Sequence, residues 1–118
     1  MELRYFFRRP KLPVLIINED EIFVARSDKI FSDIIDKHDF SRHDYYNLLD
    51  CRNEGWAFYQ NYNTISPLVV KKHWTKKELI QLYNNSKTIR DKGLEQLEEK
   101  ILYKTFKQIF DIFVDTLR

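Results

Sequence analysis

Residues 14–25 read VLIINEDEIFVA, in which two short apolar runs flank a polar segment. Both runs are rich in β-branched side chains, which favour strands, and residues 18–20 between them are of the polar types common in turns. This pattern predicts a β-hairpin. Pro10 and Pro13 precede it and lack backbone donors, so the alternating segment around Tyr5 is predicted to be a separate strand that ends before them.

Two helices are predicted to follow this hairpin. Ser27 or Asp28 can cap the first, and apolar residues at helical spacing follow it: Ile30, Phe31, Ile34 and Ile35. The second is predicted to begin near Ser41, because Asp44 three residues later resembles a capping box. Its inward residues would be Tyr45, Leu48 and Leu49, and residues 53–55 are expected to end it.

The rest of the chain is predicted to form a second hairpin and then helices. Strands are expected over residues 55–60 and 64–70, and Thr75 with Glu78 fits a capping box that starts a helix. From residue 87 to residue 117 we expect one long amphipathic helix, in which Gly93 weakens the first turns. Its apolar stripe comprises Leu94, Leu97, Ile101, Leu102, Phe106, Ile109, Phe110, Phe113 and Leu117.

The fold class expected from this order is α+β. The chain has 118 residues, of which 43% are hydrophobic and 15% aromatic, enough to bury a core without disulfides or metals. We therefore expect one domain over residues 1–118, with an antiparallel sheet built from two hairpins and covered on one face by helices. The long C-terminal amphipathic helix would close the core.

The cysteine content and the N-terminal residues bear on the compartment. Cys51 is the only cysteine, which excludes an intramolecular disulfide and a zinc site made of several cysteines. The first nine residues lack the apolar run of a secretory signal, and no apolar run approaches the roughly 20 residues that span a bilayer. We therefore expect a cytoplasmic protein in which Cys51 is a half-buried structural thiol.

The most distinctive charged segment is KKHWTKK at residues 71–77. Its lysines would neutralise phosphates and its indole would stack on a base, so one interpretation is a nucleic-acid or anion contact. The other is a solvated basic turn whose tryptophan packs against the following helix. The candidate binding residues are Lys71, Lys72, Trp74, Lys76 and Lys77, extended by Arg8, Arg9 and Lys11 if the first strand lies beside the turn.

Two other polar groups are candidates for function. An acidic surface that binds a basic protein partner is predicted from Glu19, Asp20, Glu21, Asp33 and Asp36, although the same residues also fit a solvated turn and the polar face of a helix. The dipeptides His38–Asp39 and His43–Asp44 offer ligands for a divalent metal. Their five-residue spacing would not bring both imidazoles to one ion on one helix, which favours a solvated loop and no metal site.

Signatures of enzymes are absent from the sequence, since there is no G-x-S-x-G, no glycine-rich phosphate loop and no H-E-x-x-H. We therefore favour a non-enzymatic protein-binding module, such as a regulator, an inhibitor or an immunity-type partner, without a cofactor. A nucleic-acid-binding accessory protein that uses residues 71–77 is the first alternative. A small metal-dependent phosphodiesterase that uses the histidine–aspartate pairs is the second. A homodimer through the C-terminal helix is expected if its apolar stripe is wider than the sheet can cover.

Overall fold

The computed structural model describes residues 3–68, 74–94, 96–97 and 104–117. Its strands are β1 (Arg4–Tyr5), β2 (Val14–Asn18), β3 (Glu21–Ala25), β4 (Tyr46–Asp50), β5 (Gly55–Tyr59) and β6 (Thr64–Pro67). Its helices are α1 (Asp28–Lys37), a short 3-10 turn η1 (Gln60–Tyr62), α2 (Lys76–Asn84), α3 (Lys87–Asp91) and α4 (Phe106–Thr116). The predicted α+β class is confirmed.

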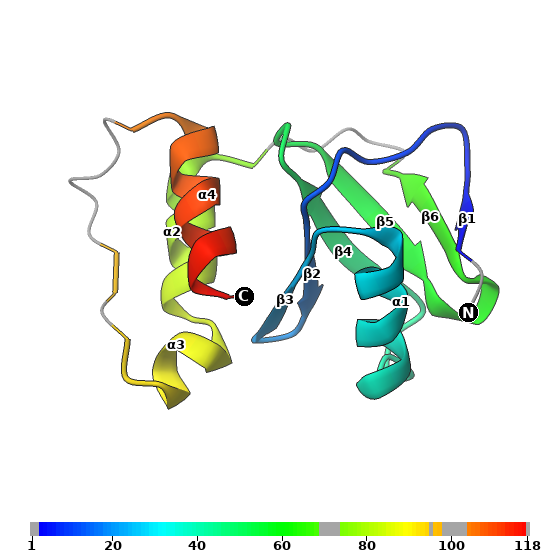
Figure 1. The fold of residues 1–118 in the computed structure, drawn as a ribbon, viewed down its shortest axis with the longest axis horizontal. Coiled ribbons are helices and arrows are strands. Elements are labelled where there is room, and N and C mark those ends of the chain that lie inside the picture. Colours follow the sequence, from blue (N-terminus) through cyan, green and yellow to red (C-terminus); the bar gives the residue numbers. More distant parts are fainter. Residues whose placement is uncertain (1–2, 69–73, 95, 98–103, 118) are drawn as a thin grey trace.

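The six strands form one sheet in the order β1-β6-β5-β4-β2-β3 (Figure 1). Every neighbouring pair is antiparallel except β1 and β6, which are parallel and join the N-terminal segment to the middle of the chain. The β2–β3 hairpin turns tightly between Asn18 and Glu21, as residues 14–25 predict. The pair β5–β6 is the predicted second hairpin, connected through η1. Strands β4 and β5 form a further antiparallel hairpin that was not predicted from the sequence.

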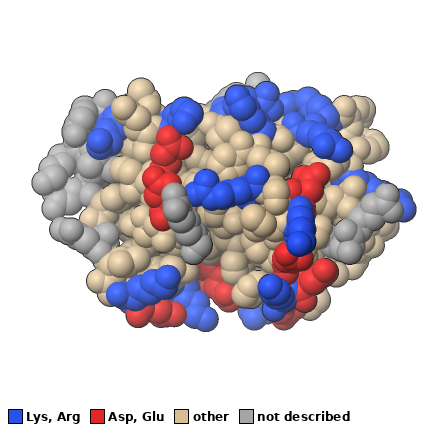
Figure 2. Space-filling model, in the orientation of Figure 1, with Lys and Arg blue, Asp and Glu red and all other residues tan. Residues whose placement is uncertain are grey.

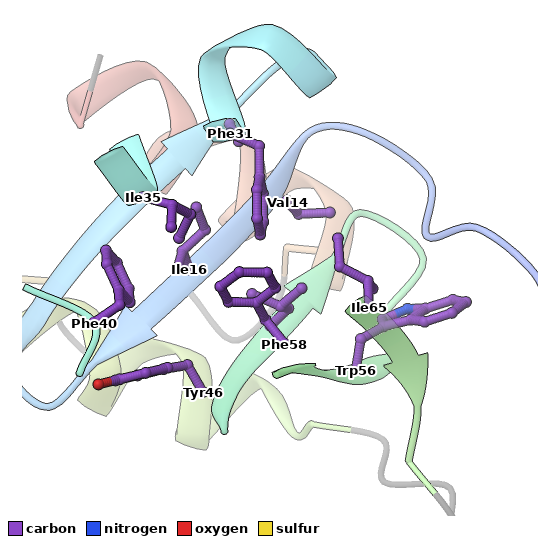
Figure 3. Packing of buried hydrophobic residues seen from close by; sticks show 11 residues of the cluster. Val14, Ile16, Phe31, Ile35, Phe40, Tyr46, Trp56, Phe58 and Ile65 are labelled. Carbon is purple, nitrogen blue, oxygen red and sulfur yellow. The ribbon is translucent and has the colours of Figure 1, made fainter. Parts of the chain in front are cut away.

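Helices lie on both faces of the sheet, so the expectation that they cover one face is wrong. Strand alternation sends Val14 and Ile16 of β2 toward α1, where they meet Phe31 and Ile35 (Figure 3). Leu15, between them, points to the other face and packs in a second cluster with α2, α3 and α4. Because both faces of β2 are buried, its sequence is continuously apolar rather than alternating.

The segment predicted as a second short helix is strand β4. Tyr46 and Leu48 face the α1 side and Leu49 faces the other side. The apolar residues of β4 are therefore packed in both core clusters. The expected cap does not form at Ser41, whose N–H and hydroxyl both donate to the carboxylate of Asp39. Pairing with β2 and β5 on its two edges overrides the weak helical pattern.

The predicted length of the C-terminal helix is also wrong. Gly93 adopts a positive φ of 62°, and residues 92–94 leave the helical path after α3. Helix α4 begins only at Phe106, where Thr105 and Gln108 form a capping box. Ile101 and Leu102 of the predicted stripe lie outside the described residues. The first strand is shorter than predicted as well, because Phe7 has a φ of 70° and the chain turns there.

The predicted capping box of α2 is confirmed. The Thr75 hydroxyl accepts the Glu78 N–H at 3.1 Å, and the Glu78 carboxylate accepts the Thr75 N–H at 3.1 Å. Replacing Thr75 with alanine is expected to lower the free energy of unfolding by about 1 kcal/mol, because an orphan N–H loses its acceptor. Urea denaturation measures this, with Thr75→Ser as the control that keeps the cap. Equal losses for the two variants would contradict the cap as the cause.

Candidate functional site

Five large aromatic side chains are exposed at the β1–β6–β5 end of the molecule. Their exposed fractions are 85% for Phe7, 71% for Tyr62, 54% for Phe6, 48% for Tyr45 and 36% for Tyr59. Folded domains usually bury aromatic side chains, so an exposed group of this size indicates a surface that contacts something else. We call these five residues the aromatic face.

Strand register explains why these side chains share one side of the sheet. Tyr5 of β1 lies opposite Ile65 of β6, and both contribute to the α1 side, so the next residue, Phe6, points to the opposite side. Phe58 of β5 likewise packs on the α1 side, which sends Tyr59 the other way. Phe6, Tyr59 and Tyr62 line one hollow of about 350 Å³, together with Thr64 and Ser66.

Ring contacts extend this hollow in both directions. The Phe6 and Phe7 rings meet edge to face with centroids 4.3 Å apart. The Tyr45 and Tyr59 rings lie 5.8 Å apart, across the β4–β5 pair. Such spacings are within the range of favourable aromatic pairs, so the five side chains form a continuous surface.

The helical layer leaves this part of the sheet uncovered. Helices α2, α3 and α4 lie beside β2 and β3, whereas β5, β6 and β1 are at the far end (Figure 1). Among the described residues, the second core cluster takes side chains such as Leu15, Ile22 and Leu49 from β2, β3 and β4, and none from β1, β5 or β6. In the described part of the chain, helices therefore cover one half of this sheet face, and the aromatic face lies on the other half.

The polar side chains around the aromatic face are mostly uncharged. Thr64 and Ser66 line the first hollow, and a second hollow beside it is lined by Arg4, Asn61, Tyr62 and Asn63. Beyond Tyr45, a third hollow of about 440 Å³ includes Glu19, His43 and Asp44. The surface thus has one basic residue toward one end and carboxylates toward the other.

In the structure, Arg8 and Arg9 of the predicted basic group each lie close to a carboxylate. The Arg8 guanidinium lies 2.5 Å from Glu54 and stacks over the Trp56 ring at 4.8 Å. Arg9 stacks over the Tyr5 ring at 4.5 Å and lies 3.9 Å from Asp28.

Lys11 and Tyr5 hold the same segment in place. The backbone N–H of Lys11 donates to Asp50 at 3.3 Å, and its side chain is exposed. The Tyr5 hydroxyl donates to Asp28 at 2.6 Å; burial and this bond raise the pKa of Tyr5 above its ordinary value. This segment is therefore fastened by specific contacts to α1 and to the β4–β5 turn.

The β4–β5 turn also joins Arg8 to the predicted basic turn. Asn53 accepts the Trp74 N–H at 2.7 Å, and the next residue, Glu54, pairs with Arg8. Trp74 is half-buried against the helical core cluster. Lys71 and Lys72 lie outside the described residues, whereas Lys76 is half-buried and Lys77 exposed. Basic side chains gather along the upper edge of the molecule (Figure 2), but a nucleic-acid contact here stays a prediction.

The predicted acidic residues lie in two elements: three in the β2–β3 hairpin and two on α1. Glu19 is 3.3 Å from Arg42 and 3.2 Å from His43, and Asp20 pairs with Arg90. The other three are Glu21 on β3 and Asp33 and Asp36 on α1. Because cations already neutralise two of the turn carboxylates, less negative charge is available at the hairpin tip than the sequence suggests. The acidic binding surface stays a prediction.

The two histidine–aspartate pairs do not converge. The His38 ring packs on Phe23 with centroids 4.4 Å apart, whereas His43 contacts Glu19 and the Tyr46 ring. Hydrogen bonds from Ser41 and the nearby Arg42 hold the pKa of Asp39 below its ordinary value. Within the described ranges, no group of three or more histidine, cysteine, aspartate or glutamate side chains is arranged to hold a metal ion.

None of the five side chains of the aromatic face is among the binding residues predicted from the sequence. The sequence does contain one signal, which is the adjacent pair Phe6–Phe7 together with Tyr62 between the turn residues Asn61 and Asn63. Of the helices described, none has both the length and the apolar character to cross a membrane. Comparison with protein-family models, with curated proteins and with solved structures found no significant match to this chain.

Proposed function

We propose that this chain is a non-enzymatic protein-binding module whose partner docks on the aromatic face. The observation that carries the proposal is the exposure of five aromatic side chains on one uncovered half of a sheet face. Tyrosine and other aromatic residues dominate the energy of protein interfaces because they bury much apolar area with little loss of conformational entropy. Phe7 and Tyr62, the most exposed, are the expected anchors.

The polar neighbours of the aromatic face favour a protein partner over a nucleic acid. Asparagine, serine and threonine line its hollows with the tyrosines, a composition that resembles antibody-type binding surfaces. Among the described residues that line these two hollows, Arg4 is the only cation. Binding to a phosphate backbone draws on several lysine or arginine contacts, so a single arginine supports a nucleic acid poorly.

Replacing Phe7 and Tyr62 together with serine is expected to abolish partner capture while changing the free energy of unfolding by less than about 0.5 kcal/mol. Both side chains are exposed and contribute little to the core. The measurement is quantitative affinity capture from the native host with the full chain as bait. Leu94→Ser is the matched control, because Leu94 is 38% exposed and follows α3, away from the aromatic face.

Two results would contradict the proposal. One is that the double variant captures the same stoichiometric partner as the unaltered chain. The other is that a labelled single-stranded oligonucleotide binds the chain and loses binding in the double variant, which would make the aromatic face a platform for base stacking.

Nucleic-acid binding through the basic turn is a second candidate function. The contact of Asn53 with Trp74 and of Glu54 with Arg8 supports it, because both basic segments meet the same turn. The expected behaviour is duplex binding that weakens steeply with salt and disappears when Lys72, Lys76 and Lys77 are replaced together. No duplex binding at low salt would remove this candidate.

A further inference from the structure

Among the described strands, β3 lies at one edge of the sheet, and one row of its backbone N–H and C=O groups has no partner strand. Asn18 and Glu21 flank a two-residue turn and pair across β2 and β3, so Phe23 and Ala25 also direct their N–H and C=O groups to β2. Ile22 and Val24 alternate with them and direct theirs outward. Within the described part of the chain, no hydrogen bond reaches the backbone of Ile22 or Val24 from this outer side.

This edge lies at the bottom of a groove of about 500 Å³. Four consecutive residues of β3, from Glu21 to Val24, line it, which places the hollow along the strand rather than on one face. Ile30 and Ile34 of α1 form one wall, and α3 with Leu117 forms the other. Figure 1 shows β3 between α1 and the C-terminal end of α4. In Figure 2, a basic side chain crosses the middle of this side, and an uncharged area lies below it.

We propose that this groove binds an extended segment of a partner protein, which pairs with β3 as a further strand. Outward donors and acceptors at alternate residues are what an added strand requires, and they would give affinity independent of the segment's sequence. Apolar side chains of the segment would contact Ile30, which is 40% exposed, and Ile34. A second copy of this chain fits poorly, because its own β3 edge is recessed between the same helices.

The charged side chains that line the groove indicate which charges the bound segment would carry. Lys87, Asp91 and Lys92 of the α3 wall and Glu21 of the strand line it, and none of the four forms an ion pair with another described residue. A segment with an acidic side chain toward the lysines and a basic one toward the carboxylates would complement them. This site is separate from the aromatic face, so it can be tested independently of the proposed function.

Val24→Pro is the decisive variant. Proline removes the N–H of residue 24, which points away from β2. Edge strands tolerate proline at such positions, so the hydrogen bonds between β3 and β2 remain. Val24→Ala is the matched control, because it removes the same side-chain packing but keeps the N–H. The probe is a peptide selected on the immobilised full chain from a phage-displayed library of short random sequences, then titrated by fluorescence anisotropy.

The expected result is that the peptide binds Val24→Pro at least about tenfold more weakly than Val24→Ala. On the unaltered chain, the peptide should slow amide hydrogen exchange at Ile22 and Val24, whereas Phe23 is already protected by β2. Should Val24→Pro fail to fold, Ile30→Asp replaces it, since this exposed wall residue contributes little to stability. A carboxylate at this position would lose its hydration when apolar side chains of the peptide bind, and binding would weaken.

Three outcomes would overturn the proposal: a selection that yields no peptide, a peptide whose binding is unchanged in both Val24→Pro and Ile30→Asp, and self-association of the chain that Val24→Pro abolishes. The last would assign the edge to a second copy. The Phe7 and Tyr62 double variant should bind the peptide normally, so failure of the aromatic-face proposal and failure of this one give different results.

Discussion

Replacing Asp50 with alanine is expected to lower the free energy of unfolding by about 3–5 kcal/mol, the largest effect that we expect for a polar substitution among the described residues. The Asp50 side chain is fully buried at the end of β4. Its carboxylate accepts the Trp56 indole N–H at 3.0 Å and the backbone N–H groups of Arg52 at 2.9 Å and Glu54 at 3.0 Å. Alanine would leave these donors without an acceptor.

Asp50 also connects parts of the fold that are distant in sequence. Its carboxylate accepts the Lys11 N–H at 3.3 Å, and the Arg52 guanidinium lies 3.6 Å away. One carboxylate therefore holds the β4–β5 turn, the Trp56 ring and the segment before β2 together. Groups that share one acceptor lose their bonds together, so the cost exceeds that of a single ordinary hydrogen bond of about 1 kcal/mol.

Two further variants separate charge from shape. Asp50→Asn keeps the size of the side chain but replaces one accepting oxygen with a donor, so a loss between zero and that of alanine is expected. Trp56→Phe removes the indole donor, and its cycle with Asp50→Asn measures the coupling of that pair. Urea denaturation followed by circular dichroism gives the free energies. A loss below about 1 kcal/mol for Asp50→Ala would show that water or other groups replace the carboxylate.

The features that the sequence predicted correctly are those with local signals. The hairpin at residues 14–25, helix α1 with its Ser27 cap and the capping box of α2 each depend on residues close in sequence. Strand β4 was missed because Tyr45, Leu48 and Leu49 have the spacing of a helical face. The expectation that Tyr45 faces inward is wrong, since it lies just before the strand and is exposed. What makes β4 a strand is burial on both sides between β2 and β5, which a local pattern does not contain.

The aromatic face could not be predicted because it depends on contacts between distant segments. Arg4 and Tyr5 pair in parallel with Thr64 and Ile65, and only this register places Phe6 beside Tyr59 and Tyr62. Exposure of these aromatic residues further depends on the helical layer ending over β4. Asp50 likewise gives no sequence signal of its role. Its carboxylate gathers donors from the β4–β5 turn and from Trp56 only after that turn forms, and its remaining backbone donor, Lys11, lies 39 residues away in the sequence.

The second large effect is expected for Phe113→Ala, which should lower the free energy of unfolding by about 3–5 kcal/mol. Phe113 of α4 is fully buried, and its ring meets Tyr83 of α2 edge to face at 5.1 Å. The cluster around it also contains Leu15 and Leu49 from the sheet, so the ring contributes to both the α2–α4 contact and the sheet contact. The cavity left by alanine would weaken both interfaces at once.

Phe106→Ala is the control for this prediction, because Phe106 lies on the same helix but is only half-buried, and a loss of about 1 kcal/mol is expected. The same experiment tests the homodimer predicted through this helix. Ile109, Phe110, Phe113 and Val114 are all covered within the chain, so α4 presents no wide apolar stripe for a second copy. The urea midpoint should therefore not depend on protein concentration. A midpoint that rises with concentration and loses this dependence in Phe113→Ala would instead place the ring in a dimer interface.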